Sequence, residues 1–414
     1  MDSGKLKLIS KILNEVAEDL VFRYYEEKKE AETGLMTGKS GASLYLFHYS
    51  KYSKNEKYKK YAQTLLEEVF EDINSGKYYS PFCGGLAGVC WTIIHLVENG
   101  FIHKENLEVL DELDDYLNKS MNDFISQNYF DFLHGASGIA YYFSKKAERN
   151  PASTSKYLEY YVKKLNEYAV YNETDGTAKI ISNIYDADSK PVKVFNLSLS
   201  HGISSLVIVL SSIKKTIGFS EELDRLINGF INFIIINKNI SKTDNNSLYP
   251  GTVPLTSQRK NIAVPSRLGW CYGDIGNGYA FISGASVNGS KSYLYNTKAE
   301  EIFLNLQKRK EPSLQAINDA GICHGSAGMV CISRSLNELY KQNVYKDLED
   351  YWIDITLEFY NRKNGLDGFS RFINNEYEYD ISFLSGTTGV AMSLLTSIDS
   401  KTAKSNWQKL LLIT

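Results

Sequence analysis

Two kinds of helical segment alternate along the chain. The first kind is amphipathic: residues 57–74 place Tyr61, Leu65, Val69 and Ile73 four positions apart, with Lys and Glu on the other faces. The second kind carries almost no charge and is apolar on all sides, which predicts burial on all sides. Amphipathic segments span 8–25, 57–74, 106–125, 155–168, 220–234, 297–307 and 345–360, and examples of the apolar kind are 89–97, 203–213 and 390–398.

A pair of glycines, or a close relative of it, opens each apolar segment. The seven pairs are Gly38/Gly41, Gly85/Gly88, Gly135/Gly138, Gly202/Ser205, Gly273/Gly276, Gly325/Gly328 and Gly386/Gly389. Seven amphipathic helices that alternate with seven apolar ones close naturally into a double ring, in which small residues let the inner helices pack closely. The sequence therefore predicts an all-α fold, an α/α toroid of seven helical pairs that forms a single domain over residues 1–414.

Two stretches are longer than a helical pair needs. Residues 170–195 and 241–267 lack helical periodicity, and they contain alternating β-branched and aromatic residues, as in 179–185. We expect small insertions here, made of loops or short strands laid over the ring.

Composition narrows the class of protein and its compartment. Lys and Arg number 46 against 49 Asp and Glu, and this near balance argues against a polybasic protein that binds nucleic acid or a membrane surface. Five cysteines without a regular framework spacing fit reduced thiols in a cytosol. The N-terminus lacks a signal-peptide pattern, and no apolar stretch approaches the roughly 20 residues that span a membrane. We therefore expect a soluble, cytoplasmic protein.

The candidate chemistry lies just before the glycine pairs. If all the inner helices begin at one end of the ring, the residues before them converge on its axis. The last position before each pair holds Thr37, Gly84, His134, His201, Tyr272, His324 and Ser385, and the position before that holds Met36, Cys83, Leu133, Ser200, Cys271, Cys323 and Leu384. Three of the six histidines and three of the five cysteines fall there, far more than chance would place.

Cys271, Cys323 and His324 are the sharpest subset. Two thiolates and an imidazole leave one position open, and this is a ligand set that catalytic zinc uses. Adjacent residues point apart on a helix, so Cys323 and His324 can reach one metal only from an irregular turn before a helix. The alternative is that the cysteines are small buried hydrophobic residues, the usual fate of free Cys. Because all three residues stand just before motif glycines and should converge, we favour a zinc site.

Two segments carry a resemblance to a known family. The segment 267–273, with Trp270, Cys271 and Gly273, and the segment 322–325, with Cys323 and His324, resemble the two signature motifs of LanC-like lanthionine cyclases. The spacing between them, the Ser-His-Gly motif at 200–202 and the seven glycine pairs are similar too, from about residue 34 to 398. The resemblance implies that cysteine thiols of a precursor peptide add to dehydroalanine or dehydrobutyrine, which closes thioether rings.

The resemblance also implies roles for individual residues. Cys271, Cys323 and His324 would hold one Zn²⁺ per chain, with the substrate thiolate in the fourth position. His201 would protonate the enolate that Michael addition leaves, and Asp131 would orient a histidine or relay a proton to it. The remaining expected roles are stabilisation of the enolate oxygen or substrate by Arg267, hydrogen-bond donation by Tyr272, and lining of the peptide cleft by Trp270.

Three of these roles have a plainer competitor. Asp131 could be a helix N-cap, Arg267 a structural surface arginine and Trp270 a core residue. Among residues that the family does not require, we favour a satisfied core histidine for His134 over a second acid or base, and core packing for Cys83 over a spare metal ligand. The fourth repeat departs from the pattern at Ser205, whose Cβ and hydroxyl replace a glycine. Cys90 and Cys331 lie inside apolar helices, where packing is expected.

Three other functions remain open at this point. An inverting glycosidase needs two carboxylates, such as Asp131 and Asp274, but leaves the Cys and His residues unexplained. A non-catalytic, zinc-containing peptide-binding scaffold would close the metal site with a fourth ligand such as Cys83. Addition of a small thiol such as glutathione to dehydrated peptides could use the same residues.

The chain has the size of a cyclase alone, which bears on its partners. The resemblance then implies a precursor peptide with a leader and a dehydrated core, a separate dehydratase and an exporter. A biosynthetic complex of this kind would place the protein peripherally at the membrane. The acidic balance, with a pI near 6.1, suits a basic peptide.

Overall fold

The computed structural model describes residues 2–27, 32–185, 190–255, 263–361 and 368–413. The α-helices there are α1 (Ser3–Val21), α2 (Lys39–Ser53), α3 (Glu56–Asn74), α4 (Leu86–Glu98), α5 (Glu108–Ser126), α6 (Ala136–Ala147), α7 (Pro151–Tyr168), α8 (Ile203–Ile217), α9 (Glu221–Ile236), α10 (Asp274–Val287), α11 (Ser292–Asn305), α12 (Ser326–Tyr340), α13 (Asn343–Asn361), α14 (Thr387–Ile398) and α15 (Ser400–Ala403). The strands are β1 (Val170–Asn172), β2 (Thr177–Lys179), β3 (Ser182–Tyr185), β4 (Pro191–Asn196), β5 (Thr252–Pro254), β6 (Ser370–Ile373) and β7 (Glu376–Tyr379).

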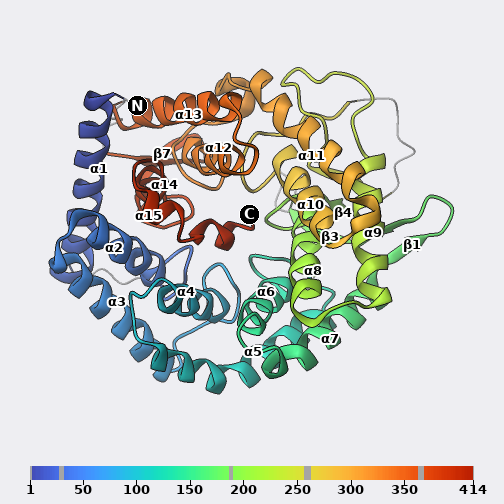
Figure 1. The fold of residues 1–414 in the computed structure, drawn as a ribbon, viewed down its shortest axis with the longest axis horizontal. Coiled ribbons are helices and arrows are strands. Elements are labelled where there is room, and N and C mark those ends of the chain that lie inside the picture. Colours follow the sequence, from blue (N-terminus) through green and yellow to red (C-terminus); the bar gives the residue numbers. More distant parts are fainter. Residues whose placement is uncertain (1, 28–31, 186–189, 256–262, 362–367, 414) are drawn as a thin grey trace. The chain divides into compact units, whose positions relative to one another are not determined.

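The helices group into two compact units, residues 1–112 with 317–414 and residues 113–316. In the first unit, buried α2, α4, α12 and α14 alternate along the chain with amphipathic α1, α3 and α13, and α14 packs against α1, α2 and α12 (Figure 1). In the second unit, α6, α8 and α10 are the buried helices, and α8 packs against α6, α9 and α10 (Figure 1). All seven apolar and seven amphipathic helices that the pattern predicts are present in the described part of the chain.

The first glycine of each pair makes room for the turn that precedes its helix. A Cβ at Gly38 would lie only 1.9 Å from the carbonyl oxygen six residues earlier, that of Glu32. The same contact would arise at Gly85, Gly135, Gly202, Gly273, Gly325 and Gly386, at 2.1–2.6 Å. Close approach between elements, which the sequence suggested as the reason, applies at Gly276, where a Cβ would lie 2.8 Å from the Cβ of Leu199. Most of these glycines are therefore required by the tight turn itself.

Backbone hydrogen bonds join the turns of neighbouring repeats in the first unit. The N–H of Cys323 donates to the carbonyl of Leu384 at 3.0 Å, and the N–H of Leu384 donates to the carbonyl of Met36 at 2.9 Å. The N–H of Met36 in turn donates to the carbonyl of Cys83 at 2.8 Å. All four residues stand two positions before a motif glycine. The predicted convergence of these positions is therefore observed within this unit.

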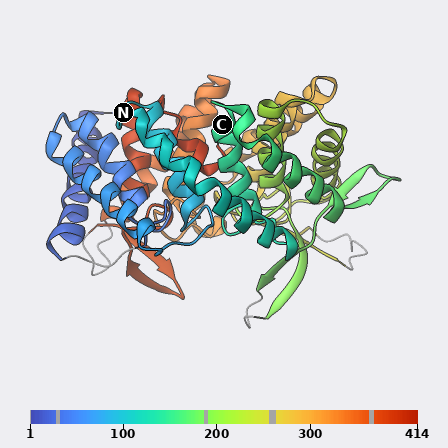
Figure 2. The ribbon, with the colours of Figure 1, turned by 90° about the horizontal axis from the view of Figure 1, so that it is seen from below.

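Short strands occupy the predicted insertions. In the first, β1 and β2 form an antiparallel pair, and β3 pairs with β4, which pairs with β5 of the second insertion. Residues 186–189 and 256–262 of these insertions lie outside the described residues. The antiparallel hairpin β6–β7 was not predicted, and Figure 2 shows it projecting from the helices of its unit.

A buried ion pair fastens the second insertion to the start of α10. Arg309 Nη1 lies 3.0 Å from Asp274 Oδ2, and both side chains are almost completely buried. The Asp274 carboxylate also accepts the N–H groups of Leu248 and Tyr249, and Arg309 Nη2 donates to the carbonyl of Ser266. Asp274 is thus fully engaged in holding the fold, which removes it as a glycosidase carboxylate.

We expect Arg309→Met to lower the free energy of unfolding by about 3–5 kcal/mol, because a buried carboxylate loses its counter-charge. Urea unfolding followed by circular dichroism measures this change. The matched control is Arg225→Met, which breaks an exposed pair with Glu173 in the same unit and should cost less than about 1 kcal/mol. Equal, small effects of the two substitutions would contradict the structural role of Arg309.

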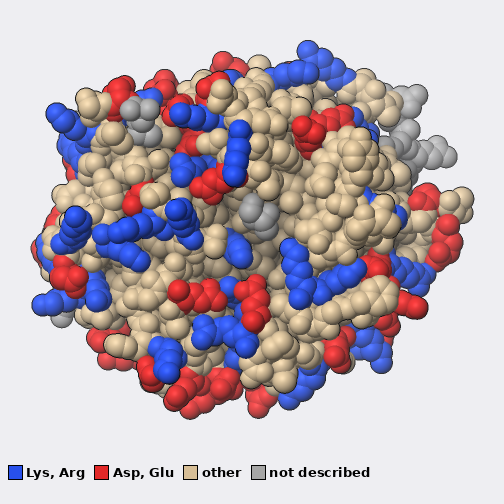
Figure 3. Space-filling model, in the orientation of Figure 1, with Lys and Arg blue, Asp and Glu red and all other residues tan. Residues whose placement is uncertain are grey.

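No helix in the described part of the chain is long and apolar enough to cross a membrane. On the face that Figure 3 shows, Lys and Arg side chains are interspersed with Asp and Glu side chains. This distribution agrees with the near-balanced composition and gives no surface of one sign on that face.

Candidate metal centre

The turn before α10 places Cys271. It ends at Gly273, whose φ of +106° lies in the region that favours glycine, so the turn depends on that residue. The carbonyl of Cys271 accepts the N–H of Leu199 and both the N–H and the hydroxyl of Ser200, at 3.1–3.3 Å. Cys271 itself is buried. These bonds tie the turn that carries Cys271 to the turn that carries His201.

Asp131 and His201 form a hydrogen-bonded pair. Asp131 Oδ2 lies 2.7 Å from His201 Nδ1, and Asp131 Oδ1 accepts the N–H of His134 at 2.8 Å. Asp131 is therefore the partner of a histidine and holds the turn before α6, but it is not the helix N-cap, because that position is Gly135. Because Nδ1–H donates to the carboxylate, Nε2 is the ring nitrogen left for other chemistry.

The electrostatics of the pair favour the protonated imidazole. Burial by itself lowers the pKa of His201, but the hydrogen bond and the negative charge of Asp131, with a smaller contribution from Cys271, raise it above its ordinary value. The His201 side chain keeps 27% of its surface exposed, so a substrate can reach it. The pair has the geometry of an acid held in place by a carboxylate.

Two other rings flank His201. The His134 ring stacks on it with centroids 5.6 Å apart, and the Tyr272 ring is tilted to it at 6.0 Å. His134 is exposed, so the expectation of a core histidine is wrong. The reason is its position: residues directly before the motif glycines stand in the turn, outside the buried helix that follows.

Arg267 and Trp270 differ in how far they fit the expected roles. Arg267 Nη2 donates to the carbonyl of Ala316 at 2.6 Å, and its Nε is buried without a partner among the described residues. Part of the guanidinium is therefore structural. Trp270 has no exposed surface, so its indole packs in the core and the prediction that it lines a cleft is wrong.

The turn before α12 places Cys323 and His324 on adjacent residues, both partly exposed. Beside them, Asp319 Oδ2 lies 3.9 Å from His324 Nε2 and accepts the N–H of Phe372, while Oδ1 accepts the N–H of Gly321. Gly325 leaves room for this carboxylate, since a Cβ there would lie 2.4 Å from Asp319 Oδ1. Asp319 is thus fixed next to a candidate ligand.

Cys271, Cys323 and His324 form a group that could hold a metal ion. Two thiolates and one imidazole suit zinc by their softness and number. All five cysteines are free, and the other three are buried. Burial raises the pKa of Cys331 to about 12, which makes that thiol unreactive, as expected for a packing residue.

Comparison with known proteins places the chain in a family. The lanthionine synthetase C-like protein family matches residues 29–412, most of the chain. The chain belongs to this family. Among the solved structures that match is nisin cyclase, with a TM-score of 0.75 and 19% sequence identity over 96% of each chain. No curated protein matches. The predicted family and fold class, an α/α toroid, are confirmed.

Within this lanthionine synthetase C-like chain, sequence reasoning missed Asp319. The available signal was its place six residues before Gly325, where it directly precedes the repeat that carries Cys323 and His324. Asp380 stands at the same position of the next repeat, before Gly386, and its carboxylate accepts the N–H of Ser382. Because the same residue type holds a turn in both repeats, its proximity to His324 could not be read from the sequence.

Proposed function

We propose that this protein is a zinc-dependent cyclase, which adds cysteine thiols of a dehydrated precursor peptide to dehydroalanine or dehydrobutyrine and forms lanthionine or methyllanthionine. The observation that carries the proposal is the group of Cys271, Cys323 and His324 in a member of the lanthionine synthetase C-like family. One Zn²⁺ per chain would be held by these three residues.

The metal answers a specific chemical need. A peptide thiol with a pKa near 8.5 is only a few per cent ionised at neutral pH, and the thiolate is the nucleophile. Zinc, when bound, supplies the positive charge that favours the thiolate form of a substrate thiol in its fourth position. Two protein thiolates would keep that sulfur nucleophilic, because they add negative charge to the site.

His201, Asp131, Arg267 and Tyr272 would act on the dehydro residue that the thiolate attacks. The thiolate sulfur forms a bond to Cβ of the dehydro residue, and the π electrons move onto the carbonyl as an enolate. His201, held by Asp131, would give its proton to Cα, so that the proton lost by the thiol is balanced by the one gained at carbon. Arg267 and Tyr272 would stabilise the enolate oxygen or hold the peptide.

The group of ligands also bears on the competing functions. It contains three residues and does not include Cys83, so a position for a substrate thiol is left. A closed, purely structural zinc in a scaffold would need a fourth protein ligand. Addition of glutathione would use the same open position, and only the identity of the attacking thiol distinguishes it.

Product analysis tests the proposal. The zinc-loaded protein is incubated with a dehydrated precursor peptide, with and without glutathione, and remaining thiols are alkylated and counted by mass spectrometry. Loss of alkylation without a mass increase indicates ring closure, whereas a gain of one glutathione mass indicates the small-thiol reaction. Full alkylation with zinc bound would support the scaffold. The precursor peptide, a separate dehydratase and an exporter are its proposed partners.

We expect Asp319→Asn to weaken zinc binding by about 10–100-fold, because a carboxylate beside a ligating histidine orients the ring and raises its basicity. Competition with a chromogenic chelator measures the affinity without any turnover. Asp380→Asn is the matched control, at the same position of the next repeat, and should change the affinity less than twofold. Equal affinities for both variants would remove Asp319 from this role.

A further inference from the structure

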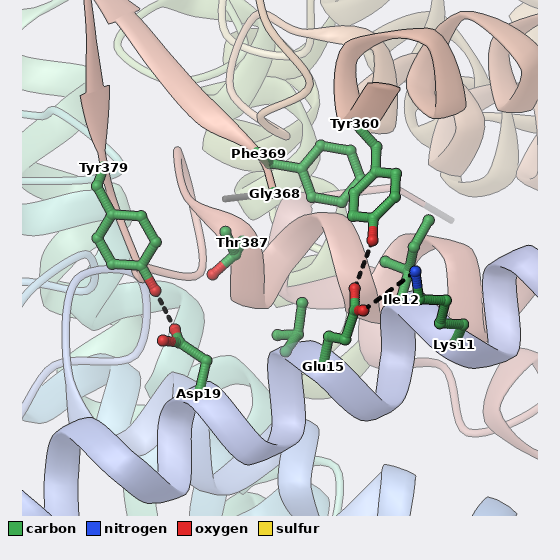
Figure 4. A pocket seen from close by; sticks show the side chains of 10 residues that line it. Lys11, Ile12, Glu15, Asp19, Tyr360, Gly368, Phe369, Tyr379 and Thr387 are labelled. Atoms are coloured by element: carbon green, nitrogen blue, oxygen red, sulfur yellow. Dashed lines mark hydrogen bonds and ion pairs between the residues drawn. The ribbon is translucent and has the colours of Figure 1, made fainter. Parts of the chain in front are cut away.

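A cavity of about 430 Å³ opens in the first unit beside α1 (Figure 4). Its walls come from α1, the end of α13, the β6–β7 hairpin and the start of α14. None of its lining residues belongs to the candidate metal centre. At this volume the cavity can accept an amino-acid side chain with some of its backbone.

Two carboxylates stand one helical turn apart on the wall formed by α1. Glu15 accepts a hydrogen bond from the Tyr360 hydroxyl, and Asp19 accepts one from the Tyr379 hydroxyl (Figure 4). Lys11 pairs with Glu15 at 3.4 Å, but both side chains are largely exposed. An exposed pair of this kind contributes little, so another cation can replace Lys11 at Glu15. Asp19 already has a counter-charge, because Arg23 Nε lies 3.1 Å from Asp19 Oδ1 and the Arg23 guanidinium lies over the Tyr379 ring. Glu15 is therefore the carboxylate that a bound cation would meet.

Thr387 provides an independent sign that the cavity takes a ligand. It is 4% exposed, and its hydroxyl has no hydrogen-bond partner among the described residues. Figure 4 shows this hydroxyl turned toward the side of the cavity that Asp19 and Tyr379 line. A buried hydroxyl without a partner destabilises the folded protein, so its presence is explained if a ligand supplies the bond.

The remaining walls favour a cation on an apolar stem. The rings of Tyr360 and Phe369 lie 5.6 Å apart at 55° and, with Ile12 and Val16, give an aromatic and aliphatic lining. Ammonium and guanidinium groups bind to aromatic faces and to carboxylates, and their alkyl stems pack on apolar surface. Lysine and arginine side chains combine these features.

We propose that this cavity binds a lysine or arginine side chain of the peptide substrate. The recognition of a basic side chain stands on the cavity, and only the statement that its bearer is the substrate rests on the proposed function. The β6–β7 hairpin connects the cavity to the candidate metal centre. Tyr379 of the hairpin lines the cavity. At its other contacts, the N–H of Phe372 donates to Asp319, and the Tyr377 hydroxyl donates to the carbonyl of Asn318.

Binding is measured by fluorescence anisotropy with a fluorescein-labelled hexapeptide that alternates glycine and arginine. The variant Glu15→Gln should bind it at least tenfold more weakly than the unaltered protein. The matched control Glu71→Gln removes one exposed carboxylate from α3 of the same unit and should change the affinity less than twofold. Equal weakening in both variants would show unspecific attraction and overturn the proposal.

Thr387→Val separates recognition from stability. Removal of an unpartnered hydroxyl should leave the thermal unfolding midpoint unchanged or raise it by about 1–2 °C, while binding of the arginine peptide weakens about three- to tenfold. A lower midpoint with unchanged binding would make the hydroxyl structural and overturn its part in the site.

The same measurement on Cys323→Ala keeps the two proposals apart. If the cavity proposal holds, Cys323→Ala binds the arginine peptide as tightly as the unaltered protein, even though zinc and ring closure are lost. Loss of peptide binding with an intact fold would overturn the cavity proposal and leave the cyclase untouched. The link to the substrate is tested with a dehydrated precursor whose basic residues are replaced by glutamine. This replacement should raise KM with the unaltered protein and leave KM unchanged with Glu15→Gln. An equal rise with both proteins would overturn that link.

Discussion

Cys323→Ala is expected to yield a folded protein that retains no zinc and closes no thioether ring. The side chain is partly exposed, and the backbone N–H of residue 323, which alanine keeps, donates to the carbonyl of Leu384, so we expect the turn to persist. The substitution leaves one thiolate and one imidazole, too few to hold zinc with one position open. Zinc content by plasma emission and thiol counting after alkylation measure the two losses, which should be complete within detection.

Cys83→Ala is the matched control for this substitution. Cys83 stands at the same position of its repeat, is buried and does not belong to the candidate metal group. It should keep one zinc per chain and full activity. Ring closure by a zinc-free Cys323→Ala protein would contradict the zinc mechanism. If the unaltered protein, prepared without chelator, contained no zinc, the result would favour the non-catalytic scaffold.

His201→Ala is expected to keep its zinc and lose about 10²–10⁴-fold in the rate of ring closure, the usual contribution of a general acid. Without a positioned acid, water protonates the enolate from either face, so the stereochemistry at Cα should be mixed. Chiral analysis of the hydrolysed product and a time course of thiol loss give both readouts. An unchanged rate with a single stereoisomer would move the acid to another residue.

Asp131→Asn tests the positioning role separately. The carboxylate raises the pKa of His201, so its removal lowers that pKa, and the protonated acid is then lost at a lower pH. The alkaline limb of the rate profile should shift to lower pH, which a merely structural defect would not produce. His134→Gln changes the other histidine beside His201 and should leave the position of this limb unchanged.

The fold could be predicted from the sequence because its information is local and repeated. A helical period is sustained over residues such as 57–74, and a glycine pair stands before each apolar run. These two signals determine the element type and its buried face. The limits are less exact, since the predicted helix 8–25 is α1 at Ser3–Val21. The same register led to Cys271, Cys323 and His324, which the structure groups as residues that could hold a metal. Their binding of zinc stays a prediction.

The features that could not be predicted depend on contacts between residues far apart in the sequence. Asp274 resembles a free carboxylate until Arg309, 35 positions away, is seen to neutralise it. Trp270 and His134 both stand near motif glycines, yet one is fully buried and the other exposed. Tertiary packing decides between these outcomes, and no local pattern encodes it. The hairpin β6–β7 was missed because the stretch between the amphipathic segment 345–360 and Gly386 was not recognised as a further insertion.

The backbone bonds that join Cys323, Leu384, Met36 and Cys83 have a consequence for how such a protein can change. Because main-chain groups make every one of these bonds, the side chains at the four positions are exchangeable without loss of the connection. Thiol, thioether and aliphatic side chains already share them. The bonds between the turns therefore persist when a side chain at these positions changes. Burial still limits the choice, because Met36, Cys83 and Leu384 are buried, and only the partly exposed position of Cys323 could gain a new polar or metal-binding group without a large loss of stability.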